Sequence, residues 1–301
     1  MSKVLITGAD GFTGRYLAKE LSNAGHEVHG LIHLPVLHGV EGVAQLHVAN
    51  LCDLPALSAV MRDVQPEKIA HLAAISFVAH GDASAIYNTN LVGTRNLLES
   101  LVLSKSPLTA VLLASSANIY GNSVEGILDE STPAAPANDY AVSKLAMEYA
   151  AALYANRLPL IIARPFNYTG VGQSESFLIP KITSHVRRKA PVIELGNLDV
   201  ARDFSDVRNV VRVYHRLLQS PLAVSQAFNV CSGKAWSLNE VLTMVREISG
   251  HDFEVRVNPA FVRQNEVKTL LGNRTKLNEA TGVMPEIELP ETLRWMLEAN
   301  H

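Results

Sequence analysis

The sequence has few cysteines, no excess of positive charge and no long apolar run. Two cysteines, Cys52 and Cys231, cannot form a disulfide framework, and neither has a metal-ligand partner at the usual spacing. We therefore expect no metal site and a reducing compartment, the cytoplasm. With 26 basic and 29 acidic residues, the chain has no basic surplus for nucleic acid or an anionic membrane. The absence of a membrane-length apolar stretch and of a cleavage-site pattern argues against a membrane span and a signal peptide.

Short β-branched runs instead alternate with helical patterns along the first half of the 301 residues. Strand then helix, repeated, predicts an α/β fold built on a Rossmann-type doubly wound parallel sheet. After about residue 165, glycines and prolines interrupt the pattern, and helical stretches return near 237–249 and 290–299. We expect a smaller, mixed α/β C-terminal lobe there that binds substrate. The strands expected in the first half are 3–6, 27–32, 46–48, 68–72 and 109–113, and the helices are 15–24, 53–64 and 90–104.

The stretch VLITGADGFTG, residues 4–14, joins the first strand to the first helix through Gly8, Gly11 and Gly14. Residues without a Cβ let a pyrophosphate approach the backbone N–H groups and the positive end of a helix. Glycines also mark ordinary tight turns, so the pattern alone is weak. Its place between a strand and a helix favours dinucleotide binding, and the spacing G-x-x-G-x-x-G differs from the usual G-x-G-x-x-G.

A second pattern, Tyr140-Ala-Val-Ser-Lys144, puts a phenol and an ammonium on one face of a helix. A nearby lysine and a cationic nicotinamide are expected to lower the tyrosine pKa. By itself this spacing is as readily an amphipathic helix. However, Ser115 and Ser116 end a predicted strand 24 positions before Tyr140, at the edge of the sheet where ligands bind. Ser116 is the candidate catalytic hydroxyl, and Ser115 is expected to be structural.

In this order and at these distances, the glycine turn, the strand-end serine and Tyr-x-x-x-Lys resemble the extended short-chain dehydrogenase/reductase family of nucleotide-sugar epimerases, dehydratases and reductases. The likeness covers nearly the whole chain. It includes HLAA at 71–74, NTNLVGT at 88–94, RPFNYTG at 164–170 and RDF at 202–204.

This resemblance implies a role for each matched residue. Tyr140 exchanges a proton with the sugar oxygen, Lys144 lowers the tyrosine pKa and holds the nicotinamide ribose, and Ser116 binds the sugar oxygen. Residues 1–165, with roughly 205–232, form the NADP(H)-binding domain, and residues 166–204 and 233–301 form the nucleotide-sugar lobe. Besides Tyr140 and Lys144, the cofactor contacts are Gly8, Gly11, Phe12, Gly14, His33, Asn50, Leu51, Leu72, Ala73, Ala74 and Asn90. The substrate contacts are Ser76, Asn118, Asn167, Arg202, Arg263 and Glu266.

Several of these assignments have alternatives. The second strand ends in Ile32-His33 without the acid that would bind a ribose 2′-hydroxyl, which favours NADP(H), with NAD(H) as the alternative. A lone histidine is nonetheless more often structural. Asn50 can accept a hydrogen bond from the adenine amino group. Arg202 could instead form a surface ion pair with Asp203, and Glu266 could be a solvated acid.

The positions after Ser116 separate the activities of the family. Dehydratases of the family carry an acidic pair there, whereas this chain has Ala117 and Asn118, which cannot carry a proton at neutral pH. The segments 196–211, 227–242 and 262–282 resemble GDP-4-keto-6-deoxymannose reductases, which make GDP-D-rhamnose. The expected reaction is reduction of the C4 ketone of a GDP-linked 4-keto-6-deoxyhexose. Alternatives are a nucleotide-sugar 4-epimerase, a dTDP-ketosugar reductase and, more distantly, a non-catalytic NADP(H) redox sensor.

The helix that begins at Tyr140, with the sequence YAVSKLAMEYAAALYANRL, is apolar over much of its circumference. Members of the family commonly pair two such helices into a four-helix bundle. We therefore expect a homodimer through the helices near 90–104 and 140–157, with a monomer core helix as the alternative.

Overall fold

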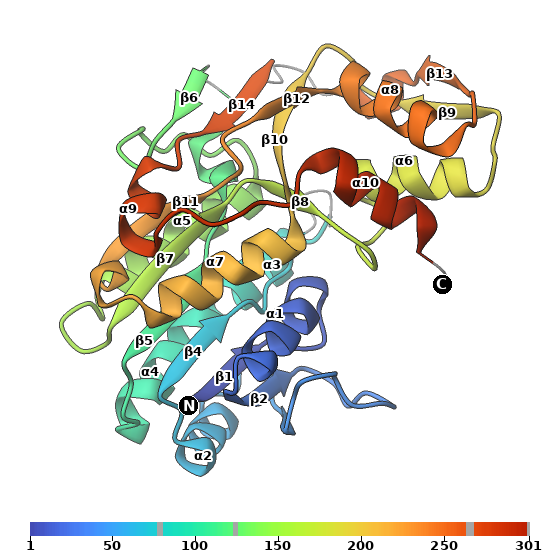
Figure 1. Cartoon of the computed structure of the whole chain (residues 1–301). Helices are drawn as coiled ribbons and strands as arrows, with labels where there is room; N and C mark the ends of the chain where they lie inside the picture. The colour runs from blue at the N-terminus through green and yellow to red at the C-terminus, as the bar shows by residue number, and fades with distance from the viewer. Residues whose placement is uncertain (77–80, 123–125, 263–267, 300–301) are drawn as a thin grey trace.

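The computed structural model describes residues 1–76, 81–122, 126–262 and 268–299, and a seven-stranded parallel sheet forms its centre (Figure 1). The strand order is β11-β7-β5-β4-β1-β2-β3, so the order reverses between β1 and β4. Ligands of open α/β sheets bind at the carboxyl ends of the strands beside such a reversal. The strands are β1 (Lys3–Thr7), β2 (Glu27–Ile32), β3 (Gln45–Val48), β4 (Lys68–His71), β5 (Ala110–Ala114), β7 (Leu160–Pro165) and β11 (Gln226–Val230).

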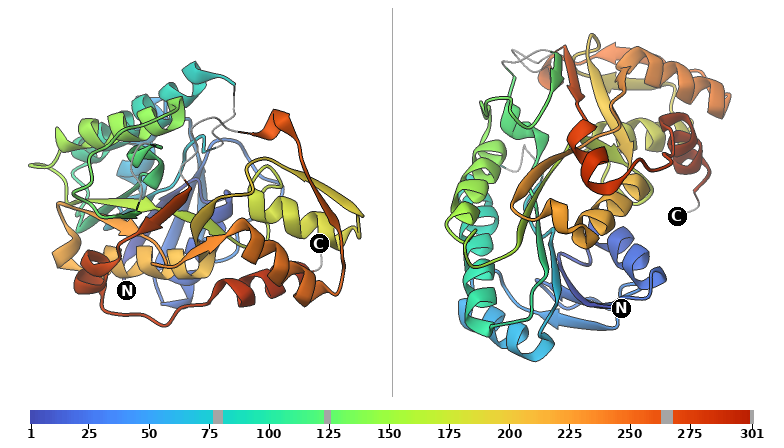
Figure 2. Two further views of the ribbon diagram at one scale, coloured as in Figure 1. Left: turned by 90° about the horizontal axis from the view of Figure 1, so that it is seen from above. Right: turned by 60° about the vertical axis from the view of Figure 1, so that its left-hand side comes forward.

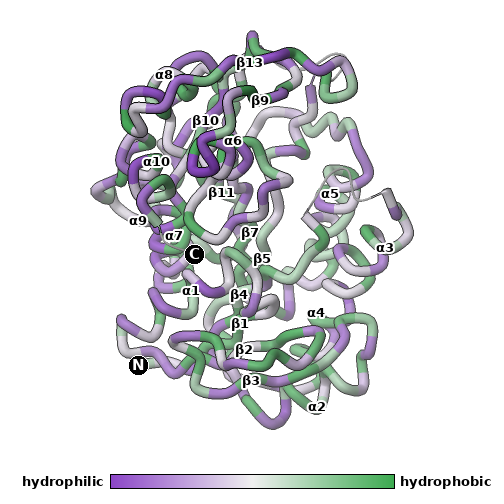
Figure 3. The backbone as a smooth tube through the Cα atoms, turned by 90° about the vertical axis from the view of Figure 1, so that its right-hand side faces the viewer, coloured by the Kyte–Doolittle hydropathy of each residue, from purple (hydrophilic) through white to green (hydrophobic). Residues whose placement is uncertain are grey.

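Helices cover both faces of this sheet (Figure 2). Alternate residues of β1 point to opposite faces, so Val4 and Ile6 join one buried core and Leu5 joins the other. This double burial explains why the strands are continuous apolar runs. The first core lies under α1 (Phe12–Asn23) and α7 (Val207–Gln219), and the second under α2 (Leu54–Val64), α4 (Thr94–Ser104) and α5 (Asp139–Ala152). Figure 3 shows hydrophobic backbone stretches in green along the labelled strands β2 and β5.

Three of the expected helices differ in their bounds. The first, expected over 15–24, is α1 and begins at Phe12. Residues 90–104 do not form a single α-helix, because a short helix α3 (Ala83–Tyr87) and a π-helical segment, Asn88–Gly93, precede α4. The helix expected over 140–157 ends at Ala152 and continues as turns, one closed by the Leu158 N–H bond to the Tyr154 carbonyl at 3.0 Å. Pro159 disfavours the α conformation at Leu158, so no helix could continue past this point.

A second assembly of strands and helices lies above the first in Figure 1. A sheet in the order β12-β10-β14-β6, with β8 paired to β10, lies beside a two-stranded sheet of β13 and β9. The strands of this assembly are β6 (Gly126–Leu128), β8 (Asn167–Thr169), β9 (Val192–Leu195), β10 (Ala201–Asp206), β12 (Ala235–Ser237), β13 (Glu254–Val257) and β14 (Thr269–Gly272). The helices are α6 (Leu178–Arg187), α8 (Leu238–Ser249), α9 (Thr275–Thr281) and α10 (Leu289–Glu298).

Strand β10 ties the two assemblies together. Its first residues pair with β12 and β14, its last residues pair with β8, and Asp206 is the N-cap of α7. The chain then returns to the large sheet, where α7 and β11 contribute the segment 207–230. In the ranges that the structure describes, no helix has both the length and the apolar character of a membrane crossing.

Candidate active site

The glycine turn lies between β1 and α1, next to the reversal of strand order. Gly8 has a φ of +68°, and a Cβ there would lie 2.9 Å from the backbone of Ala73. A Cβ on Gly14 would lie 2.1 Å from the carbonyl oxygen of Gly8. Gly11 is the N-cap of α1, which has no side-chain cap and no acidic residue in its first turn. The turn therefore leaves the positive helix end to an anion, and these residues fit a dinucleotide pyrophosphate.

The three predicted catalytic side chains come together at the carboxyl end of β5. Tyr140 lies in the first turn of α5, Lys144 lies one turn later, and Ser116 follows β5; they are 7%, 4% and 5% exposed. The Ser116 and Tyr140 side chains lie close enough for Ser116 to lower the pKa of the Tyr140 phenol. Lys144 Nζ donates to the Ala114 carbonyl at 2.7 Å and lies 6.0 Å from the centre of the Tyr140 ring.

Burial determines the protonation states of Tyr140 and Lys144. It raises the pKa of Tyr140 well above the ordinary value, and the neighbouring Ser116 hydroxyl only partly opposes this rise. Burial also lowers the pKa of Lys144 to about 8, with Glu148 acting in the opposite direction. The expected lowering of the tyrosine pKa is therefore not a property of the protein by itself. At neutral pH Tyr140 is a protonated phenol, which can donate a proton.

A hydrogen-bonded chain holds the loop after β4 against the glycine turn. His71 is buried, and its two ring nitrogens lie 2.7 Å from the Thr7 hydroxyl and 2.8 Å from the Thr94 hydroxyl. Thr7 also accepts from the Ala73 N–H at 3.2 Å. Burial lowers the pKa of His71 to about 3, so the ring is neutral. The predicted cofactor residues Leu72, Ala73 and Ala74 are half-buried in this loop.

Asn90 connects the same loop to α5. Its carboxamide accepts from the Ile75 N–H at 2.8 Å and donates to the Ile75 carbonyl and the Ser143 hydroxyl, each at 3.0 Å. Asn90 therefore links the loop after β4 to α5, and it lies in a π-helical segment of the kind often found at functional sites.

The residues expected near adenosine lie at the ends of the neighbouring strands. His33 is exposed directly after β2, and Asn50 is exposed after β3. The side-chain oxygen Oδ1 of Asn50 already accepts from the Cys52 N–H at 2.8 Å, which leaves one of its lone pairs for another donor. Leu51 is buried and packs where a Cβ on Gly93 would otherwise lie.

Among the predicted substrate contacts, Ser76, Asn118 and Asn167 are exposed. The Asn118 side-chain amide donates to the Ser116 hydroxyl at 3.2 Å, so it lies directly beside the predicted catalytic serine. Ala117 is buried. Arg263 and Glu266 lie outside the described residues.

Arg202 and Asp203 point to opposite faces of β10, so the alternative of a surface ion pair between them is wrong. Asp203 is fully buried and accepts from the Ser232 N–H, the Ser232 hydroxyl and the Gly233 N–H at 2.7–2.9 Å. Arg202 donates to two backbone carbonyls, those of Ala201 at 2.8 Å and Lys268 at 3.2 Å. The buried carboxylate fixes the strand that carries the predicted diphosphate ligand.

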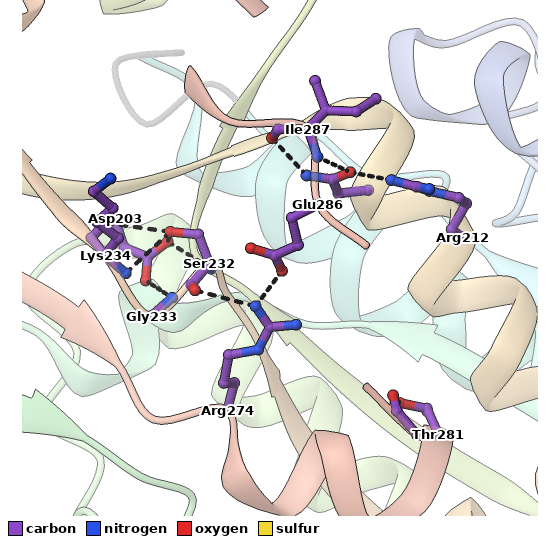
Figure 4. A network of polar contacts seen from close by, with 11 residues as sticks. Asp203, Arg212, Ser232, Gly233, Lys234, Arg274, Thr281, Glu286 and Ile287 are labelled. Atoms are coloured by element: carbon purple, nitrogen blue, oxygen red, sulfur yellow. Dashed lines mark hydrogen bonds and ion pairs between the residues drawn. The ribbon is translucent and has the colours of Figure 1, made fainter. Parts of the chain in front are cut away.

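The loop that caps Asp203 is held from its other side by Arg274 (Figure 4). The guanidinium donates to the Ser232 carbonyl at 3.2 Å and pairs with Glu286. Next to Glu286, Ile287 exchanges two backbone hydrogen bonds with the Asn209 side chain on α7. No local sequence pattern indicated this network, because its members come from four separate segments.

A second buried network lies behind Lys144. Glu148, one helical turn after Lys144, forms a bidentate pair with Arg164 at 3.0 and 2.7 Å and accepts from the Ser115 hydroxyl. Arg164 also donates to the Tyr120 hydroxyl at 3.1 Å. This agrees with the structural role expected of Ser115. The only signal for Arg164 was its place at the start of RPFNYTG.

Within the described ranges, no group of three or more histidine, cysteine or acidic side chains could hold a metal ion. A glycine turn under a Rossmann sheet, with a buried serine, tyrosine and lysine at its carboxyl edge, defines an enzyme of the extended short-chain dehydrogenase/reductase class. The sequence matches the GDP-mannose 4,6 dehydratase family over residues 5–296, and the chain belongs to this family.

Three relatives show the range of activities nearby. The chain is 35% identical to GDP-6-deoxy-D-talose 4-dehydrogenase from Aggregatibacter actinomycetemcomitans, over 93% of this chain and 91% of the relative. It is 32% identical to GDP-6-deoxy-D-mannose reductase from Pseudomonas aeruginosa, over 98% and 96%, and the structure of that species' RMD with NADPH has a TM-score of 0.84. A structure from Burkholderia cenocepacia J2315, described only provisionally as an epimerase, is 50% identical, with a TM-score of 0.94 and coverage of 99% and 97%.

These likenesses confirm the predicted Rossmann-type fold and the predicted family. They also confirm an enzyme of the oxidoreductase type, because the relatives are named as dehydrogenases, reductases and dehydratases of GDP-sugars.

Proposed function

We propose that this enzyme reduces the C4 ketone of a GDP-linked 4-keto-6-deoxyhexose to an alcohol. The observation that carries the proposal is the catalytic group itself. A protonated, buried Tyr140 lies beside the buried Ser116, and the two positions after Ser116 carry Ala117 and Asn118 instead of acids. This arrangement supports proton donation to a sugar oxygen and lacks an acid-base pair for removing water there.

The protein supplies the acid and the orientation of the reacting oxygen. When bound, a reduced nicotinamide supplies the hydride that attacks the C4 carbon. Tyr140 gives its proton to the C4 oxygen, so one hydride and one proton convert the ketone to the alcohol. Ser116 hydrogen-bonds the same oxygen, and Asn118 fixes the Ser116 hydroxyl. Lys144 holds the nicotinamide ribose and stabilises the phenolate that remains after the transfer.

We propose NADP(H) as the preferred cofactor, with NAD(H) as the alternative. No acid follows β2, and the exposed His33 stands at the place where a 2′-phosphate would be read. The NADPH complex of the Pseudomonas relative supports this preference. Residues 1–165 with roughly 205–232 would form the cofactor domain, and the remainder would form the substrate lobe. Asn167, Arg202, Arg263 and Glu266 are proposed to bind the nucleotide diphosphate and ribose.

The product has two candidates that differ at C4. GDP-D-rhamnose is favoured by the resemblance to GDP-6-deoxy-D-mannose reductase, and GDP-6-deoxy-D-talose is favoured by the relative at 35% identity. Oxidation of either sugar at C4 gives the same 4-ketone, so one substrate tests both.

We further propose a cytoplasmic homodimer. The face formed by the π-helical segment, α4, α5 and the turn that follows carries exposed apolar side chains, a pattern typical of an interface. They are Val92, Leu103, Val142, Tyr149 and Leu153, with Tyr149 69% and Leu153 75% exposed.

The deciding experiment follows the loss of NADPH absorbance with freshly prepared GDP-4-keto-6-deoxymannose. The dTDP analogue and UDP-glucose are run in parallel, and the product is identified by NMR. Stoichiometric NADPH oxidation with the GDP sugar alone supports the reductase, and the C4 proton couplings distinguish the two products. Interconversion of a nucleotide sugar without net oxidation would show an epimerase instead. Tyr140→Phe is the matched control, since unchanged turnover in this variant would contradict the mechanism and leave the redox-sensor alternative.

A further inference from the structure

Two hydrogen bonds and an aromatic stack join the start of α1 to β8 and the residues after it. The Thr13 and Tyr168 hydroxyls lie 2.9 Å apart, and the Tyr16 hydroxyl donates to the Val171 carbonyl at 2.7 Å. The Phe12 ring stacks on Tyr168, with ring centres 6.2 Å apart and planes inclined by 12°. We call these contacts the α1–β8 bridge, and Figure 1 shows the two elements that it joins.

The two ends of the bridge lie beside the proposed sites of different ligands. Thr13 lies in the first turn of α1, directly after the glycine turn that fits the cofactor pyrophosphate. Tyr168 follows Asn167, the proposed diphosphate ligand, on a strand that pairs with β10 and therefore with the strand of Arg202. The bridge thus connects the cofactor half of the site to the substrate half.

Tyr168 also lies close to the reaction centre. It is half-buried, and its hydroxyl is near enough to Tyr140 to raise the pKa of the catalytic phenol. The bridge therefore lies where the nicotinamide and the sugar must meet. Hydride transfer is sensitive to this spacing, since a misplacement of about 1 Å can reduce turnover roughly 100-fold.

Strand β8 needs such support because it is short. It has three residues and pairs with β10. Three residues form only a short ladder with β10, and the half-buried Tyr168 adds both a stack and a hydrogen bond to it.

We propose that Thr13 and Tyr168 are positioning residues, whose hydroxyl pair holds the cofactor end of α1 at a fixed distance from the substrate strand. This inference rests on the proposed reductase function. Neither residue is assigned a proton or a bond in the reaction, and both act through α1 and β8.

The test is a double-mutant cycle with Thr13→Val, Tyr168→Phe and both together. Valine keeps the shape of threonine, and phenylalanine keeps the stack on Phe12, so each variant removes only one hydroxyl. Each single variant should lower kcat about 10-fold and change the KM for NADPH less than about threefold. The double variant should be no slower than the singles, because they remove the same bond. Thr13→Ser should retain most of kcat.

Tyr154→Phe is the matched control. It also removes one tyrosine hydroxyl, which donates to Glu99 at 3.1 Å beyond the end of α5, and it should leave kcat unchanged. Melting temperatures confirm that every variant is folded. Unchanged kcat in the single variants, or losses that multiply in the double variant, would contradict the positioning role proposed for Thr13 and Tyr168.

Failure of the proposed function appears differently, as a wild type that oxidises NADPH with none of the ketosugars. In that case the fluorescence of bound NADPH, measured without any sugar, tests whether the α1–β8 bridge positions the cofactor. Equal changes in both single variants, with no further change in the double variant, support it. Unchanged fluorescence in all three contradicts it.

Discussion

Replacing Lys144 with methionine should stabilise the cofactor-free protein while abolishing its activity. The side chain is 4% exposed, and burial lowers its pKa from 10.5 to about 8. A lowering of this size corresponds to roughly 3 kcal/mol of penalty for holding the charge in the fold at neutral pH. Methionine removes the charge at similar volume but loses the hydrogen bond to the Ala114 carbonyl, worth about 1 kcal/mol. The net expected gain is about 2 kcal/mol in the free energy of unfolding.

The gain should depend on pH in a defined direction. Below pH 8 lysine is charged in both the folded and the unfolded chain, so the folded state bears the full penalty. Between about pH 8 and 10.5 the folded state releases the proton while the unfolded chain keeps it, and the stability of the wild type rises with pH. The advantage of Lys144→Met should therefore be largest below pH 8 and shrink toward pH 10.

Urea unfolding followed by circular dichroism, at about pH 7, 8.5 and 10, measures the gain in the free energy of unfolding and its change with pH. Lys19→Met is the control, because this lysine is exposed and its ion pair with Glu41 should be worth less than about 0.5 kcal/mol. A variant less stable than the wild type at pH 7, or a difference that does not vary with pH, would refute the reasoning.

Three further perturbations test other parts of the structure. Gly14→Ala brings a Cβ within 2.1 Å of a backbone oxygen, so it should lower the free energy of unfolding by about 3 kcal/mol and remove most of the NADPH affinity. In the control Gly39→Ala the new Cβ has no atom within 4 Å, so the urea midpoint and the affinity should not change. Arg164→Met leaves the Glu148 charge without its ion-pair partner and should lower the free energy of unfolding in urea by about 3 kcal/mol. Adding Glu148→Leu should recover most of this loss, and a double variant as unstable as Arg164→Met would contradict the prediction. Tyr149→Glu should convert the proposed dimer to a monomer in light scattering, and an unchanged mass would exclude this face as the interface.

The half of the fold that we propose as the cofactor domain was predictable because its strands are buried on both faces. Val4, Leu5 and Ile6 divide between two cores, so the run is apolar throughout and is easily recognised. In β10 the buried positions include Asp203 and Asp206, whose partners come from distant loops and helices. A strand with buried carboxylates has no apolar pattern, and the sequence therefore did not indicate it.

Helix α7 is a different case, since its signal was present. Apolar residues recur at helical spacing from Val207 to Leu218 and are buried, and Asp206 is a favourable N-cap. The glycines and prolines between residues 170 and 196 made the whole region look irregular. In the site, the spacing of Tyr140 and Lys144 and the strand-end position of Ser116 were readable locally. The supports of Lys144 and of the loop after β4 depend on contacts between separate elements.

The return of the chain to the large sheet affects how the protein is made. The face of the sheet under α1 is completed by α7, and its edge is completed by β11, so both arrive after β8, β9 and β10. At ribosomal rates of about 5–20 residues per second, several seconds separate the synthesis of β7 from that of β11. During this interval the nascent chain exposes the apolar face and the open edge of β7, where aggregation begins most easily. A message that stops after β7 should therefore yield an insoluble fragment and no independent cofactor domain.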